Sequence, residues 1–62
     1  MKEIEIREVP KCGLFRLKDS ENSLLWIRGS YDETTDEYEC YSIEDINNEI
    51  FCRSNRKVFV ED

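Results

Sequence analysis

The sequence predicts a small all-β domain of five to six short strands with at most one helical turn, either a partly closed barrel of SH3-like or OB-like type or a meander sheet. Short runs of apolar, β-branched and aromatic residues recur at a spacing of about 8 to 12 residues, which is typical of such folds. Polar turns, some with Gly or Pro, separate these runs. A chain of 62 residues allows a single domain, residues 1–62, with a thin core.

The first strand is predicted from the alternation of apolar and charged residues in KEIEIREV, residues 2–9. A period of two residues places Ile4 and Ile6 on one side of a half-buried strand and the charged residues on the other. The segment PKCG at 10–13 then predicts a turn, because Pro fixes φ and Gly admits a positive φ.

Two further strands are predicted at 14–18 and 24–31. In the first, LFRLK, the side chains of Phe15 and Leu17 are expected to point inward. The second, LLWIRGSY, combines large apolar and aromatic residues in the strongest strand pattern of the chain. Gly29 interrupts this pattern, which predicts a β-bulge or bend of the kind that curves a sheet.

An acidic hairpin loop, DETTD at 32–36, is predicted between the strand at 24–31 and its partner at 37–43. The absence of Gly from this loop favours a connection longer than a two-residue turn. The following segment EDINNE, at 44–49, suits one helical turn, which Ile46 is expected to anchor to the core.

The last two strands are predicted at 50–53 and 57–60, on either side of the turn SNR. In the second of these, KVFV, Val58 and Val60 point inward if Phe59 points outward, because successive side chains alternate between the faces of a sheet. The chain thus supplies six strands.

The register of the hairpin decides which side chains are displayed, and two registers are open. If Tyr31 lies opposite Glu37, one face carries Leu25, Ile27, Tyr41 and Ile43, and the other carries Trp26, Arg28, Tyr38, Cys40 and Ser42. If Tyr31 lies opposite Tyr38, then Leu25 and Ile27 share a face with Cys40 and Ser42, and Arg28 faces Tyr41. The first register is preferred because it segregates the aliphatic side chains better.

The composition argues against an enzyme. The chain has 15 Asp and Glu residues, 9 Lys and Arg residues and no His, which gives a net charge of −6. Without His it lacks the commonest general base near neutral pH and the commonest metal ligand. The negative charge also disfavours binding to nucleic acid or to an anionic membrane. We therefore expect no catalytic residues and no cofactor.

The three cysteines, Cys12, Cys40 and Cys52, form an odd set without CxxC spacing. They are expected to be reduced thiols, two of them small buried hydrophobes and Cys12 exposed in its turn, because structural zinc sites pair their ligands at much shorter spacing. No apolar signal segment opens the chain and no apolar run approaches the ~18 residues of a membrane span. A cytoplasmic protein without a membrane segment is expected.

The acidic loop also suggests a calcium site, because hard cations prefer several carboxylate oxygens from one short segment. Counted from Asp32, the EF-hand pattern requires Gly where Glu37 stands and Glu where Ile43 stands. The sequence therefore predicts a solvated hairpin tip and no metal ion.

A binding surface is predicted from six residues of the hairpin and the strands that follow it: Trp26, Arg28, Tyr38, Arg53, Arg56 and Lys57. Trp, Tyr and Arg are enriched at protein interfaces, so a non-enzymatic module that binds another protein is the leading hypothesis. The same residue types bind single-stranded nucleic acid on small barrels, which is one alternative. An acidic mimic of nucleic acid, or inhibitor, from a mobile element is another. A monomer or a weak homodimer is expected.

The segments WIRGSYD, YECYSIEDINNEIF and KVFV, within residues 24–60, resemble a group of small uncharacterised proteins of gut bacteria and their phages or mobile elements. In that group a Trp-x-Arg-Gly-x-Tyr-Asp strand leads into Tyr-x-Cys-Tyr and then into an Asp-x-Asn-x-Glu segment, here Asp45, Asn47 and Glu49. Relatives often carry a basic residue before the second strand and a His after the Asn, where this chain has Asp36, Glu37 and Asn48. The resemblance implies a stand-alone small β protein and no particular mechanism.

Overall fold

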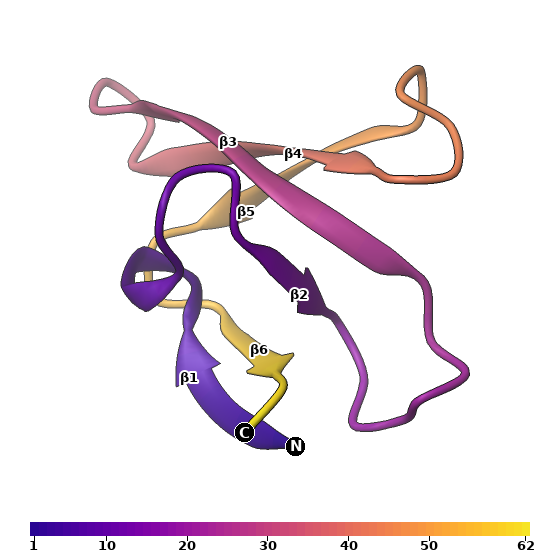
Figure 1. Ribbon diagram of the computed structural model, residues 1–62. Helices are drawn as coiled ribbons and strands as arrows, with labels where there is room; N and C mark the ends of the chain where they lie inside the picture. The colour runs from indigo at the N-terminus through magenta and orange to yellow at the C-terminus, as the bar shows by residue number, and fades with distance from the viewer.

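The computed structural model describes residues 1–62 and confirms the all-β prediction. Its elements are β1 (Lys2–Glu5), the 3₁₀ turn η1 (Ile6–Glu8), β2 (Leu14–Arg16), β3 (Leu25–Asp32), β4 (Glu37–Ser42), β5 (Glu49–Arg53) and β6 (Lys57–Val60). Figure 1 shows β3 crossing in front of β4 and β5, with β1 and β6 below them. The two termini lie side by side, and the amino group of Met1 is 3.7 Å from a carboxylate oxygen of Asp62.

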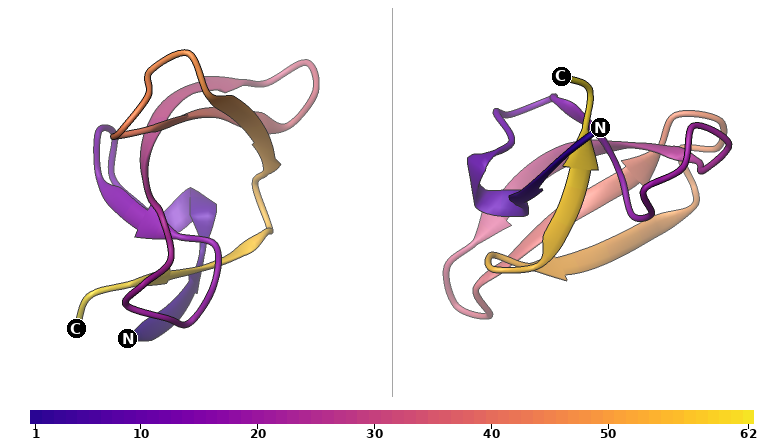
Figure 2. Two further views of the ribbon diagram at one scale, coloured as in Figure 1. Left: turned by 90° about the vertical axis from the view of Figure 1, so that its right-hand side faces the viewer. Right: turned by 90° about the horizontal axis from the view of Figure 1, so that it is seen from below.

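All six strands belong to one antiparallel sheet in the order β1-β6-β2-β3-β4-β5. The sheet curls around its core, as the left view of Figure 2 shows, but β1 and β5 do not pair, so it stays open. The last strand departs from a simple meander. After the turn at 54–56, β6 leaves β5 and inserts between β1 and β2.

The β3–β4 hairpin contains both of the registers that the sequence left open. Near the tip, Tyr31 lies opposite Tyr38. Below the tip, Trp26 lies opposite Ser42 and Arg28 opposite Cys40, which is the register of the preferred alternative. A bulge between Arg28 and Tyr31 separates the two halves, because one extra residue on β3 shifts the pairing by one position. The bulge predicted at Gly29 is confirmed.

The core lies on the inner side of the curled sheet and consists of Ile6, Val9, Phe15, Trp26, Tyr38, Cys40, Cys52 and Val58. Strand β4 explains its arrangement, since the residues of EYECYS alternate between half-buried and buried positions. The carboxylates of Glu37 and Glu39 stay outside at low cost, which places the residues between them inside. Cross-strand pairing then places Trp26 on the same inner side as Ser42.

The predicted first strand ends earlier than expected, at Glu5, and η1 follows it. The backbone N–H of Ile6 donates to the carbonyl of Arg56 (2.9 Å), and that of Arg7 donates to the carbonyl of Ser54 (3.2 Å). These bonds fix the chain against the turn at 54–56. Residues three apart in a 3₁₀ turn lie on one side, so Ile6 and Val9 are both buried.

The helical turn expected at 44–49 is wrong. The side chain of Asp45 accepts the N–H of Asn47 (3.0 Å), and its carbonyl accepts the N–H of Asn48 (2.8 Å). This local bonding closes a tight turn in place of a helix. The expected anchor, Ile46, is 77% exposed.

The tip of the hairpin is joined to the turn at 54–56 through Asp36. The loop at 33–36 is longer than two residues, as predicted, and ends on Asp36 with φ of 58°. One carboxylate oxygen of Asp36 accepts the hydroxyl of Tyr31 (2.7 Å) and the other accepts the hydroxyl of Ser54 (2.9 Å). The hydrogen bond from Tyr31, followed by that from Ser54, lowers the pKa of the Asp36 carboxyl below its ordinary value of 3.8.

Candidate interaction surface

The aromatic members of the predicted binding surface lie in the core. Trp26 is 6% exposed and Tyr38 is 7% exposed. Trp26 lies between Phe15 of β2 and Ser42 of β4 in the cross-strand pairing. Neither ring can be displayed to a partner while the sheet is intact, so the expectation that they form part of a binding surface is corrected.

Arg28 is half-buried on the same inner side as Tyr38. The Cζ atom of its guanidinium group lies 4.3 Å from the centroid of the Tyr38 ring, a cation–π contact. The Tyr38 ring in turn packs on that of Tyr31, with centroids 4.8 Å apart and planes inclined by 44°. Arg28 is therefore fixed at one end of the core beside two rings that pack at a tilt.

The basic members Arg53, Arg56 and Lys57 are exposed and gather around the turn at 54–56. Arg7 joins them through the backbone bonds of η1. Glu5 neutralises part of this group, since its carboxylate lies 2.6 Å from the guanidinium of Arg7 and 3.5 Å from the ammonium of Lys57. The buried rings of Trp26 and Tyr38 cannot give this basic group the stacking platform that single-stranded nucleic acid uses.

Aliphatic and aromatic side chains instead occupy the outer side of β2, β3 and β4. Leu14, Ile27 and Tyr41 lie opposite one another on these three strands. Leu25 and Ile43 form the next row, where the N–H of Ile43 donates to the carbonyl of Leu25 (3.2 Å). We call these five residues the outer apolar face. Leu14 is 50% exposed and Ile43 46%, and the other three are half-buried.

Gly29 leaves room for the Tyr41 ring on the outer apolar face. A Cβ atom at this position would lie 2.7 Å from the carbonyl oxygen of Glu39 and 2.9 Å from Cε2 of Tyr41. The Tyr41 ring therefore rests over the backbone of Gly29, where any side chain would displace it. Its hydroxyl donates to the carboxylate of Glu39 (3.1 Å). That hydrogen bond, together with desolvation and the nearby charges of Glu39 and Glu49, raises the pKa of Tyr41 to about 12.

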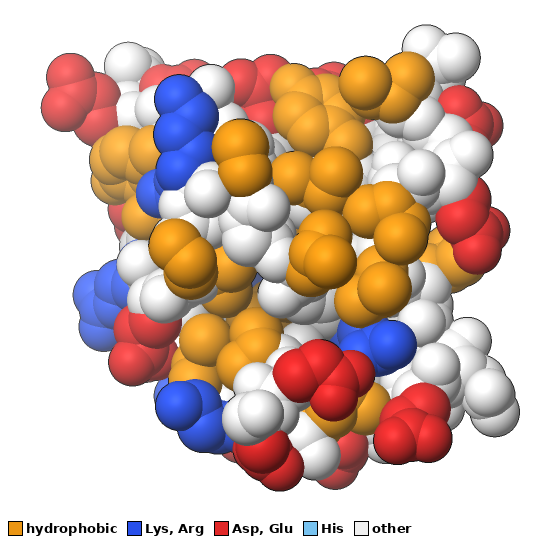
Figure 3. All heavy atoms as spheres, in the orientation of Figure 1, with side chains coloured by type: hydrophobic (Ala, Val, Ile, Leu, Met, Phe, Trp, Pro, Cys, Tyr) orange, Lys and Arg blue, Asp and Glu red, His pale blue; other side chains and the backbone are white.

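Acidic side chains border the outer apolar face. Figure 3 shows hydrophobic side chains gathered over β2 and β3, with most of the acidic ones at the edge of the view. Glu39 and Glu49 flank Tyr41, and Glu44 and Asp45 are exposed just beyond Ile43. Other acidic residues belong to the 19–21 and 32–36 loops at opposite ends of the sheet. The carboxylates named here are thus divided between the border of the outer apolar face and the two ends of the sheet.

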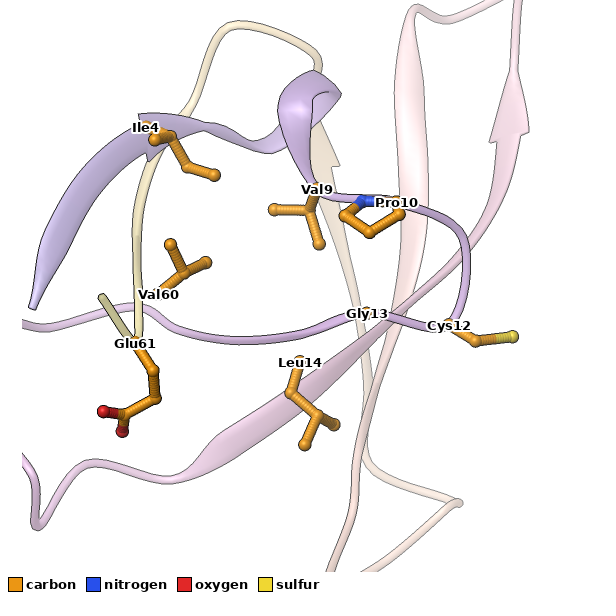
Figure 4. Close-up of a pocket in the computed structure, with 8 residues that line it drawn as sticks. All are labelled: Ile4, Val9, Pro10, Cys12, Gly13, Leu14, Val60 and Glu61. Atoms are coloured by element: carbon orange, nitrogen blue, oxygen red, sulfur yellow. The ribbon is translucent and has the colours of Figure 1, made fainter.

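A shallow hollow of about 470 Å³ adjoins the face at Leu14. Ile4, Val9 and Val60 point toward one another across it in Figure 4, whereas the side chain of Leu14 and the thiol of Cys12 point away. Its one charged lining residue, Glu61, accepts a hydrogen bond from the guanidinium of Arg16 (2.7 Å). The hollow suits an apolar side chain, because its only carboxylate already has a cationic partner.

The cysteines lie where the sequence predicts them. Cys40 and Cys52 are buried in neighbouring strands, and Cys12 is exposed in its turn with φ of 67°. The neighbouring Cys52 thiol, together with desolvation, raises the pKa of Cys40. No three His, Cys, Asp or Glu side chains come close enough together to hold a metal ion.

The structure contains no helix with the length and apolar character needed to cross a membrane. Comparison of the chain with protein-family models, with curated proteins and with solved structures finds no match in any of the three. The resemblance drawn from the WIRGSYD and YECY segments stays a prediction.

The outer apolar face was missed by sequence reasoning, although β4 carries a signal for it. Two acids at 37 and 39 cannot enter a thin core, so residues 38, 40 and 42 must, and Tyr41 is then outside. Applied through the preferred register, this rule places Leu25 and Ile27 outside as well. This consequence is easily missed, because aliphatic side chains are usually core residues.

Proposed function

We propose that this chain is a non-enzymatic interaction module that binds another protein through the outer apolar face. The observation that supports the proposal is the contiguity of Leu14, Leu25, Ile27, Tyr41 and Ile43 on three neighbouring strands. Single exposed apolar residues are ordinary, but a contiguous apolar patch on a small protein marks an interaction site more often than chance.

The chemistry of the partner follows from the border of the face. Carboxylates of Glu39 and Glu49 lie beside Tyr41, and the whole chain carries a charge of −6. A partner that offers aliphatic side chains flanked by Lys or Arg would bury the apolar rows and satisfy the acids at the rim. The hollow beside Leu14 provides a place for one of its apolar side chains.

Two features support leaving catalysis out of this proposal. The chain has no His, and the hollow has a single carboxylate, which is held by Arg16. A reducing compartment such as the cytoplasm is proposed as the location, because three free thiols in so short a chain suit it.

The test compares two charge-introducing variants on the face, Leu14→Glu and Ile43→Glu, with a matched control, Ile46→Glu. All three positions are exposed, so the folds are expected to survive, which circular dichroism checks. Each protein is used as bait in quantitative affinity capture from host lysate. Partners that bind through the face are lost from both face variants and retained by the control. Equal recovery of every protein by all four baits would refute the proposal.

A further inference from the structure

Strand β5 forms a free edge of the sheet, since it pairs with β4 alone. In the right view of Figure 2 it lies along one border of the molecule. The bonds from Ser42 N–H to the Asn48 carbonyl (3.0 Å) and from Ser54 N–H to the Asp36 carbonyl (3.1 Å) fix which residues face β4. Because antiparallel hydrogen bonding alternates, residues 50 and 52 also face β4, and residues 49, 51 and 53 direct their N–H and C=O groups away from the sheet.

These outward-directed groups are open to a partner strand. Among the backbone hydrogen bonds outside the strands, only the carbonyl of Arg53 is used, by the N–H of Arg56 (2.9 Å). The edge has no Pro, no Lys and no bulge, and its two charged outer side chains, Glu49 and Arg53, lie on either side of Phe51, which is 55% exposed. An edge of this kind is a template for another β-strand.

The outer side chains of β5 are complementary to those of a second, antiparallel copy of the same strand. On the outer side the order is Glu49, Phe51, Arg53. In an antiparallel pair of β5 strands centred on Phe51, each Glu49 faces Arg53 of the second copy, and the two Phe51 rings face each other. Opposite charges and aromatic pairs directly across strands are the stabilising combinations. The same centring pairs the free N–H and C=O groups reciprocally.

We propose that two copies of this chain associate through their β5 edges, antiparallel across a two-fold axis at Phe51, so that the two sheets become continuous. A second copy fits this edge better than an arbitrary strand because the acid-aromatic-base order is complementary to itself. The proposal is independent of the outer apolar face, which lies on β2, β3 and β4 and stays open in the dimer.

The dimer is expected to be weak. Five residues of edge strand bury much less than the ~1,600 Å² of a standard interface, so the dissociation constant should be on the order of 100 µM. Sedimentation equilibrium from about 10 µM to about 1 mM then covers the transition between monomer and dimer. A protein that remains monomeric over this whole range would overturn the proposal.

Charge reversal tests the pairing itself. In Arg53→Glu both cross-strand pairs become acid against acid, and in Glu49→Arg both become base against base, so each variant should weaken the dimer at least about tenfold. An equimolar mixture of the two variants should form a heterodimer in which both pairs are opposite in charge. The double variant Glu49→Arg/Arg53→Glu should recover the wild-type dissociation constant within about threefold, and it keeps the wild-type net charge.

The matched control is Lys11→Glu, which makes the same charge change as Arg53→Glu at an exposed position outside β5 and should leave the dimer unchanged. Isotope-filtered NMR on a mixed labelled and unlabelled sample should detect contact between Phe51 rings of different copies. A dimer that is as tight in Arg53→Glu as in the wild type, or single variants that fail to associate when mixed, would overturn the proposal. Either result would assign the association to another surface.

Discussion

Replacing Trp26 with Ala is expected to destabilise the domain severely. Trp26 is 6% exposed and packs between β2 and β4, so its loss costs about 3–5 kcal/mol, the usual range for a buried Trp or Phe. A chain of 62 residues has a total stability of about 3–9 kcal/mol. The substitution therefore removes a third to all of the stability, and the melting temperature should fall by at least about 12 °C.

The matched control is Phe51→Ala, another aromatic residue truncated on the outer side, where the ring is 55% exposed. Its cost should be below about 1 kcal/mol, measured near 5 µM so that association does not contribute. Thermal unfolding followed by far-UV circular dichroism measures both variants, with proton NMR to report side-chain packing. A Trp26→Ala protein that keeps its dispersed spectrum and melts within about 5 °C of the wild type would contradict the burial of this ring.

Three further outcomes are expected. Gly29→Ala should destabilise the domain by about 1–3 kcal/mol in thermal unfolding, because a Cβ atom there would meet the carbonyl of Glu39 at 2.7 Å; an unchanged melting temperature would show that the bulge can relax. Asp36→Asn should reduce the loss of unfolding free energy at acidic pH. The lowered pKa of the Asp36 carboxyl contributes stability that is complete above pH 3.8 and is lost as the pH falls below it. The same pH dependence of the unfolding free energy in both proteins would contradict this. Dithionitrobenzoate should titrate Cys12 at once and the two buried thiols only on unfolding, so three fast thiols would contradict the burial.

The positions of the strands could be predicted because each strand pattern is carried by consecutive residues. The pairing of the strands depends on residues far apart in the sequence. The strands at 57–60 and around 24–31 and 37–43 lie where the patterns place them, give or take one residue. The insertion of β6 between β1 and β2 has no local signal, since it is set by the bonds from η1 to the turn at 54–56. The error at 44–49 has a local cause, because the Asp45 side chain competes for the N–H groups that a helix would order.

The candidate site was harder to predict than the fold for a specific reason. The run at 24–27, LLWI, is apolar on both faces, so periodicity alone cannot say which face is inside. The β3–β4 hairpin combines both registers, one on each side of the bulge, so neither register alone describes it. Residues of the basic group were placed correctly on the surface, whereas the two aromatics assigned to the same surface were not.

The small size of the domain explains why aromatic residues fill its core while aliphatic residues lie on the outer side. A single curled sheet of 62 residues has one enclosed side, and filling it with few residues favours large rings, which bury about 150–250 Å² each. Trp26, Tyr38 and Phe15 meet that need, so Leu25, Ile27 and Ile43 are left on a side that no second layer covers. Apolar area left in water forgoes about 25 cal/mol per Å² that burial would yield. A partner that covers the outer apolar face would recover it, which is why this side of the sheet, and not the ring of Trp26, is where binding should be sought.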